Sequence, residues 1–158
     1  MIVVGVGNDL RGDDAAGLEV VRRLRDLGGE NSGIEVHEHR GDALGLLERL
    51  TAARAALLVD AVRAAPGSPV GTISCIDASR EWLRDEWSGA ATTHVAGLGA
   101  AVELGRRLGT LPPLVVVYGI SGAEFLVGQG LSAQVARAIP LVAARVRLHA
   151  LRLARASN

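Results

Sequence analysis

The fold is decided by the first 24 residues of the chain, which read MIVVGVGNDLRGDDAAGLEVVRRL. Residues 1–4 are an apolar run that leads into the glycine-rich residues 5–8, and an amphipathic run follows over residues 18–27. This order predicts a buried strand, a tight turn and a helix. Asp13 and Asp14 lie where the predicted turn meets the predicted helix, so this junction is the first candidate for a functional site.

The composition indicates one domain without a strong charge. The chain has 158 residues, and its 17 acidic and 17 basic side chains balance. We therefore expect no general attraction to nucleic acid or to acidic lipid. No apolar run approaches the roughly 20 residues of a membrane span, and no secretion signal is visible before the first strand. We expect a single domain over residues 1–158, located in the cytoplasm.

The reactive side chains are few. Every basic residue is an arginine, and the absence of lysine excludes Schiff-base catalysis, a Ser-Lys dyad and a P-loop. Cys75 is the single cysteine, as expected in a reducing compartment, and we expect it to be a small core residue on a strand rather than a nucleophile. The chain has neither a Gly-x-Ser-x-Gly elbow nor a His-Glu-x-x-His helix.

The rest of the chain alternates between short apolar runs and amphipathic runs. This alternation predicts an α/β three-layer sandwich, with a twisted, mostly parallel sheet of about five strands and helices on both faces. The polar second strand is expected near an edge of the sheet, and the fourth could pair antiparallel with its neighbour. We expect strands at residues 1–4, 33–40, 55–60, 70–76 and 114–120, and helices at residues 18–27, 44–50, 95–108 and 132–154.

Three polar residues fall near the carboxyl ends of predicted strands, where open parallel sheets bind ligands. Asp14 follows the first strand, Asp60 ends the third, and His94 precedes the helix that leads to the fifth. Two carboxylates and an imidazole suit a divalent first-row metal and leave coordination positions open. Each residue also has a structural interpretation, because an acidic residue at a helix start is often a cap. Asp13 in particular is expected to be the helix cap and not a ligand.

Several segments, in order along the chain, resemble the hydrogenase maturation proteases. These are the endopeptidases that trim the large subunit of nickel-iron hydrogenases. The likeness covers most of the chain and is carried by residues 5–14 (GVGNDLRGDD) with Gly17, residues 41–46 (GDALGL), 57–62 (LLVDAV), 93–98 (THVAGL) and 128–132 (GQGLS), and Ile139-Pro140.

The resemblance implies a function and a site. Members of this family remove a C-terminal extension from the large-subunit precursor once nickel has been inserted. Their metal-binding residues correspond to Asp14, Asp60 and His94, which would therefore serve both metal binding and catalysis. The nickel is supplied by the precursor, although another divalent metal could occupy the site in isolation.

Four further residues are expected to contact the substrate, namely Gly7, Asn8, Gly41 and Asp42. For Gly41 and Asp42, turn chemistry is an alternative explanation. The protein itself is expected to be a monomer or a weak dimer.

Two departures from the family pattern bear on these expectations. Ala15 stands where the family commonly has a glycine after the acidic pair. After the fifth strand, residues 121–124 read SGAE where a Glu-Pro pair is frequent. Neither change affects a proposed ligand, but the second leaves open how that rim meets the substrate.

Three alternatives compete with this interpretation. A dinucleotide site would need a glycine where Leu10 stands, and the acidic pair would repel phosphate. His37 and His39 would share one face of a strand and could hold a metal, although a polar edge strand is the plainer account. A non-proteolytic nickel-binding or hydrogenase-assembly scaffold would use the same three ligands as a protease.

Overall fold

A computed structural model of the 158-residue chain describes residues 1–28, 33–83 and 97–156. Strands and helices alternate along most of the chain, as the sequence predicts, and β4 alone follows a strand directly. They are β1 (Ile2–Val6), the 3-10 helix η1 (Gly12–Ala15), α1 (Ala16–Asp26), β2 (Glu35–His39), α2 (Ala43–Thr51), β3 (Ala56–Arg63), β4 (Ile73–Asp77), α3 (Leu98–Leu108), β5 (Val115–Gly122) and α4 (Ala133–Ala156).

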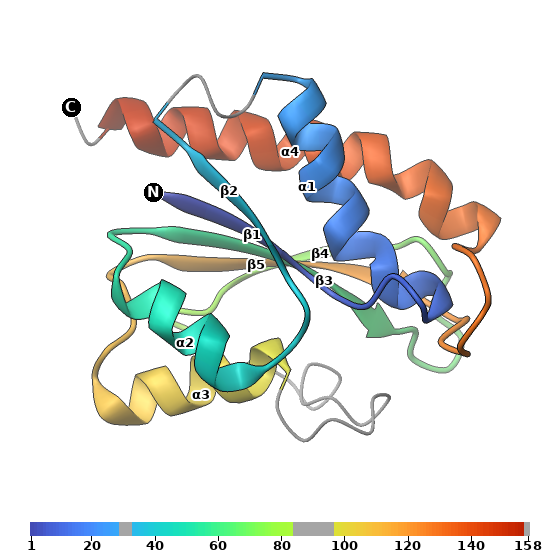
Figure 1. Ribbon diagram of the computed structural model, residues 1–158, viewed down its shortest axis with the longest axis horizontal. Coiled ribbons are helices and arrows are strands. Elements are labelled where there is room, and N and C mark those ends of the chain that lie inside the picture. The colour runs from blue at the N-terminus through green and yellow to red at the C-terminus, as the bar shows by residue number, and fades with distance from the viewer. Residues whose placement is uncertain (29–32, 84–96, 157–158) are drawn as a thin grey trace.

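The strands form one sheet in the order β2-β1-β3-β5-β4. β2, β1, β3 and β5 are parallel, and β4 pairs antiparallel with β5 (Figure 1). The polar strand β2 lies at one edge and the antiparallel strand β4 at the other, which confirms both predictions. β3 extends beyond the predicted end at Asp60, because its pairing with β5 continues to Arg63 and Gly122.

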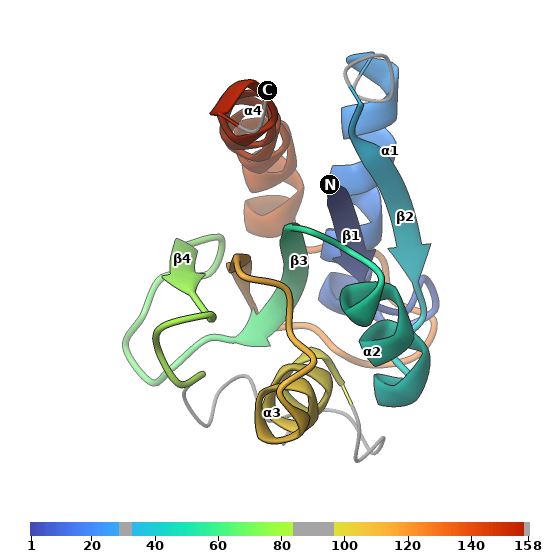
Figure 2. The same ribbon diagram turned by 90° about the vertical axis from the view of Figure 1, so that its left-hand side faces the viewer.

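Helices cover both faces of this sheet, so the three-layer sandwich is confirmed. α1 and α4 pack on one face, and α2 and α3 pack on the other (Figures 1 and 2). The parallel strands are apolar on both sides because each side faces a helical layer. In β1, for example, Val3 belongs to the core under α1 and α4, whereas Val4 belongs to the core under α2 and α3.

Some local predictions need correction. The helix after β1 begins earlier than residue 18, because η1 runs directly into α1. Cys75 is exposed on the edge strand β4, so its assignment to the core was wrong. Residues 95 and 96, at the start of the predicted third helix, lie outside the described part of the chain. Within the described residues, no helix is both long enough and apolar enough to span a membrane.

Candidate functional site

The strand order places a topological switch point between the carboxyl ends of β1 and β3. The chain leaves β1 toward β2 on one side and later returns to β3 on the other side. Ligands of doubly wound sheets bind at such a switch point, because no connection covers the crevice there. Asp14 follows β1 in η1, and Asp60 lies in the carboxyl half of β3. The fold thus brings these two predicted site residues to the same crevice.

Glycines allow η1 and α1 to lie directly against the strands. A Cβ on Gly17 would lie 2.2 Å from the Val6 carbonyl oxygen and 2.4 Å from that of Val59. A Cβ on Gly7, whose φ is 154°, would lie 1.9 Å from the Asp14 carbonyl oxygen. No larger residue fits such contacts without moving the backbone. Gly7 therefore fixes the position of Asp14, and its expected contact with substrate stays a prediction.

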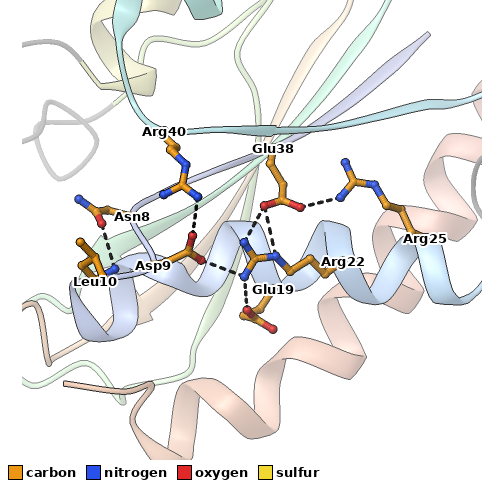
Figure 3. Close-up of polar contacts among 8 residues, drawn as sticks. All are labelled: Asn8, Asp9, Leu10, Glu19, Arg22, Arg25, Glu38 and Arg40. Atoms are coloured by element: carbon orange, nitrogen blue, oxygen red, sulfur yellow. Dashed lines mark hydrogen bonds and ion pairs between the residues drawn. The ribbon is translucent and has the colours of Figure 1, made fainter. Parts of the chain in front are cut away.

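The turn between β1 and η1 is closed by its own hydrogen bonds. The Asn8 N–H donates to the Asp14 carbonyl oxygen at 3.2 Å, and the Asp14 N–H donates to that of Arg11 at 3.1 Å. The Asn8 side-chain oxygen accepts the Leu10 N–H at 2.9 Å, as Figure 3 shows. Asn8 thus organises the turn, and its expected contact with substrate stays a prediction.

The carboxylates of Asp14 and Asp60 interact electrostatically. Asp14 is 8% exposed. Burial and the negative charge of Asp14 together hold the pKa of Asp60 well above its usual range. The Ala61 N–H donates a hydrogen bond to Asp60 Oδ1 at 2.8 Å, and this bond acts to lower the pKa of Asp60. Two carboxylates this close repel each other when both are ionised, and a divalent cation would stabilise both charges.

The third predicted ligand, His94, lies outside the described residues. Within residues 1–28, 33–83 and 97–156, no three His, Cys, Asp or Glu side chains form a group that could hold a metal. The trio of Asp14, Asp60 and His94 therefore stays a prediction. α3 begins at Leu98 on the α2/α3 side of the sheet, shortly after His94 in the sequence. Asp60 lies on that side too by strand alternation, since Leu58 and Val62 belong to its core.

Asp13 has a role that sequence reasoning missed. It does not cap its own helix, so that prediction was wrong. Its fully buried carboxylate accepts three backbone N–H groups from the segment between β5 and α4, those of Ala123 at 2.9 Å, Glu124 at 3.0 Å and Ser132 at 2.7 Å. Asp13 therefore joins the β1–η1 turn to the loop before α4. In the sequence, the only sign of this structural role is the position of Asp13 next to Asp14.

Gly41 and Asp42 form the start of α2 at the carboxyl end of β2. Gly41 has a φ of 91°, which favours glycine, and the Asp42 side chain accepts the Gly45 N–H at 2.6 Å as the helix N-cap. His39 Nε2 lies 2.7 Å from the Asp42 carbonyl oxygen. Turn chemistry thus accounts for the pair. The Asp42 side chain is still 73% exposed, so its predicted contact with substrate remains open.

The two histidines of β2 have separate partners. His37 Nδ1 lies 3.4 Å from Arg49 of α2, whereas His39 contacts Asp42. Neither belongs to a three-residue metal group among the described side chains. Their positions agree with a polar edge strand.

An ion-pair network fixes the outer side of the site turn to α1 and β2 (Figure 3). The Arg22 guanidinium contacts Asp9 at 2.9 Å and Glu38 at 2.6 Å. Arg40 contacts the other oxygen of Asp9 at 3.0 Å, and Arg25 contacts Glu38 at 2.6 Å. The hydrogen bonds with Arg22 lower the pKa values of Asp9 and Glu38. The network therefore connects the turn to α1 and to the carboxyl end of β2.

Fold and site together define the class: a doubly wound α/β domain with paired acidic side chains at its topological switch point. No family model and no curated protein matches the sequence. Solved structures do match it.

The hydrogenase maturating endopeptidase HybD from E. coli has a TM-score of 0.69 and 23% identity, over 96% of this chain and 91% of that one. The NiFe hydrogenase maturation protease HycI from Thermococcus kodakarensis has a TM-score of 0.66 and 20% identity, over 96% and 91%. The hydrogenase 2 maturation peptidase from a Thaumarchaeota archaeon has a TM-score of 0.62 and 25% identity, over 95% and 96%. The chain thus has the fold of the hydrogenase maturation proteases, as its sequence motifs predicted.

Proposed function

We propose that the protein is an endopeptidase of hydrogenase maturation, which removes a C-terminal extension from the large-subunit precursor of a nickel-iron hydrogenase after nickel insertion. The observation that carries the proposal is the pairing of Asp14 with Asp60 at the switch point of this fold. The similar solved structures support the choice of reaction, since they include a hydrogenase maturation protease and a hydrogenase maturating endopeptidase.

The substrate's own metal fits the chemistry of the pair. Two adjacent carboxylates in a partly dry crevice are costly when both are ionised, and the raised pKa of Asp60 expresses this cost. A divalent cation on the precursor would offset the repulsion, so the pair would favour a nickel-loaded precursor over an empty one. A metal held there would polarise a peptide carbonyl or activate water.

We infer that His94 supplies the third ligand. His94 comes shortly before α3 in the sequence, and α3 lies on the face of the sheet that carries Asp60. An imidazole would add a nitrogen donor to two oxygen donors, which is a set that suits nickel and other first-row metals.

The substrate chain would reach this crevice along the carboxyl end of β2. Apart from the two chain neighbours of Gly41, no described residue has a heavy atom within 4 Å of the position of a Cβ there, and the Asp42 carboxylate is mostly exposed. Both therefore remain accessible beside the turn that contains Gly7 and Asn8. We assign these four residues to substrate positioning, with Asp14, Asp60 and His94 at the reacting peptide.

The decisive experiment measures the intact mass of a candidate large-subunit precursor after incubation with the protein, with and without inserted nickel. We expect loss of a C-terminal peptide only from the nickel-loaded precursor. Asp14→Asn and Asp60→Asn should abolish the loss while retaining the wild-type circular dichroism spectrum.

The exposed Asp26, at the end of α1, gives the matched control, since Asp26→Asn removes one acidic charge far along the helix from the crevice. This variant should cleave at the wild-type rate. Full activity in both site variants would contradict the assignment. A stable complex without cleavage, seen with more than one precursor, would indicate an assembly scaffold instead.

A further inference from the structure

A pocket lies on the face of the sheet that α1 and α4 cover, between α4 and the edge strand β4. Its volume is about 340 Å³, which lies within the range of small-molecule sites. Its lining comes from β4, β5 and α4 and consists of Cys75, Tyr118, Arg145, Leu148, His149 and Arg152. Tyr118 belongs to the core under α1 and α4, opposite the face that carries Asp60, so this pocket is separate from the site of the proposed reaction.

Two guanidinium groups give this pocket a positive charge. In the described part of the chain, no hydrogen bond or ion pair engages Arg145 or Arg152. The carboxylate of Asp77, close to Cys75 on β4, already contacts Ser79 at 3.1 Å and Arg80 at 3.5 Å. α4 itself has no acidic residue over Ala133–Ala156. The described residues around the pocket therefore do not neutralise its charge.

The floor of the pocket offers polar groups that suit an anion. The Tyr118 hydroxyl lies 2.8 Å from His149 Nδ1, and the two rings meet edge to face. Cys75 pairs with Tyr118 across the two strands, so its thiol shares this face of the sheet. Leu148 adds an apolar wall, half exposed at 52%. A solvated helix face would not by itself combine a cavity, two guanidinium groups without partners and a hydrogen-bonding floor.

We propose that this pocket binds a small anion bearing a carboxylate or phosphate group, held between Arg145 and Arg152. Guanidinium groups bind both kinds of anion through charge-assisted hydrogen bonds. The anionic group could belong to a free metabolite or to an acidic side chain of another protein, and the experiment below separates these sources. The inference does not depend on the proposed peptidase activity.

Cys75 provides the readout, because it is the only cysteine of the chain and it lines the pocket. Burial raises the pKa of its thiol, so alkylation by iodoacetamide is followed at alkaline pH, where more thiolate forms. The alkylation rate is measured by intact mass against increasing inorganic phosphate, citrate or a short acetylated oligoglutamate peptide. Sodium chloride keeps the ionic strength constant.

We expect at least one of these anions to slow alkylation in a saturable manner, by about fivefold or more at saturation. Arg145→Gln and Arg152→Gln should each weaken the apparent affinity about tenfold, as expected for loss of a hydrogen bond to a charged group. Arg137→Gln is the matched control, because Arg137 is exposed on the same helix but does not line the pocket. It should leave the affinity unchanged.

Each outcome of the alkylation experiment either identifies the kind of anion that binds or overturns the proposal. Protection by phosphate or citrate would identify a free anion as the ligand, and protection by the peptide alone would identify an acidic segment of a protein. Absence of saturable protection by all three probes would overturn the proposal. Equal protection of wild type, Arg145→Gln and Arg152→Gln would overturn it as well, because the guanidinium groups would then have no part in binding.

Discussion

The Asp13 carboxylate accepts the Ser132 N–H at 2.7 Å, although the two residues are 119 positions apart in the sequence. Together with the N–H groups of Ala123 and Glu124, this contact gives Asp13 three charge-assisted hydrogen bonds in a fully buried position. The residue next to the site carboxylate Asp14 therefore fixes the loop before α4. The candidate site and the loop before α4 are therefore connected through the adjacent residues Asp13 and Asp14.

Replacement of Asp13 should destabilise the whole domain. Asp13→Ala leaves three part-buried N–H groups without their acceptor, and we expect a loss of about 2–4 kcal/mol in the free energy of unfolding. Urea denaturation followed by circular dichroism measures this loss. Asp26→Asn, at an exposed position, should change the stability by no more than about 0.5 kcal/mol. A similar small change in Asp13→Ala would show that the loop is held by other contacts.

The acidic pair should make the stability of the protein depend on pH. Because the pKa of Asp60 is raised in the folded state, the unfolded chain ionises first as the pH rises above about 4. The free energy of unfolding then falls with rising pH until the folded-state pKa of Asp60 is passed. Asp60→Asn removes this cost, and in the absence of added metal we expect it to stabilise the protein by about 0.5–2 kcal/mol at neutral pH.

Thermal melts of wild type and Asp60→Asn between about pH 3 and pH 8 provide the check. The two melting temperatures should approach each other toward about pH 3, where the carboxyl group is mostly protonated in both the folded and the unfolded states, and should separate as the pH rises. Asp14→Asn removes one cause of the raised pKa and should reduce the same pH dependence. Parallel curves for wild type and Asp60→Asn over the whole range would contradict the electrostatic interpretation.

The sequence predicted those features of the fold and the site that depend on local patterns of residues. Apolar runs and glycine turns identified the strands, and the position of Asp14 and Asp60 relative to strand ends identified the crevice. The contacts of Asp13 could not be predicted in this way, because they join residues 110 to 119 positions apart and depend on how two loops pack. Cys75 was misplaced for a similar reason. Its short strand resembles a core strand in composition, and only the sheet order shows that β4 is an edge.

The ion-pair network around Arg22 should contribute modest stability that is lost in acid. Arg22 lowers the pKa values of Asp9 and Glu38, so its contribution is present above about pH 4 and disappears as these carboxylates are protonated. Arg22→Gln should cost about 1 kcal/mol at neutral pH and low salt, and less at 1 M salt, since the groups are partly exposed.

Chemical denaturation with urea at pH 7 and pH 3, each at two salt concentrations, measures this contribution. The control is Arg107→Gln, which removes a single, mostly exposed contact with Glu103 at 2.6 Å on α3. An isolated surface pair contributes little, so this variant should remain within about 0.5 kcal/mol of wild type. Equal losses in the two variants would show that the network is no stronger than one surface pair.

Close packing at Gly17 should be essential for the site, because α1 contacts the backbone of both β1 and β3 there. A Cβ would lie 2.2 Å from the Val6 carbonyl oxygen and 2.4 Å from that of Val59, so Gly17→Ala must push the helix away from the sheet. We expect a loss of about 3 kcal/mol or more in the free energy of unfolding, at the upper end of overpacking effects.

Gly130→Ala is the matched control, since a Cβ at Gly130 meets no heavy atom of the described residues within 4 Å, chain neighbours aside. Differential scanning calorimetry should show a large decrease in melting temperature for the first variant and almost none for the second. A stable Gly17→Ala protein with a normal melting temperature would mean that α1 can shift without cost, and that the position of Asp14 is less fixed than its contacts indicate.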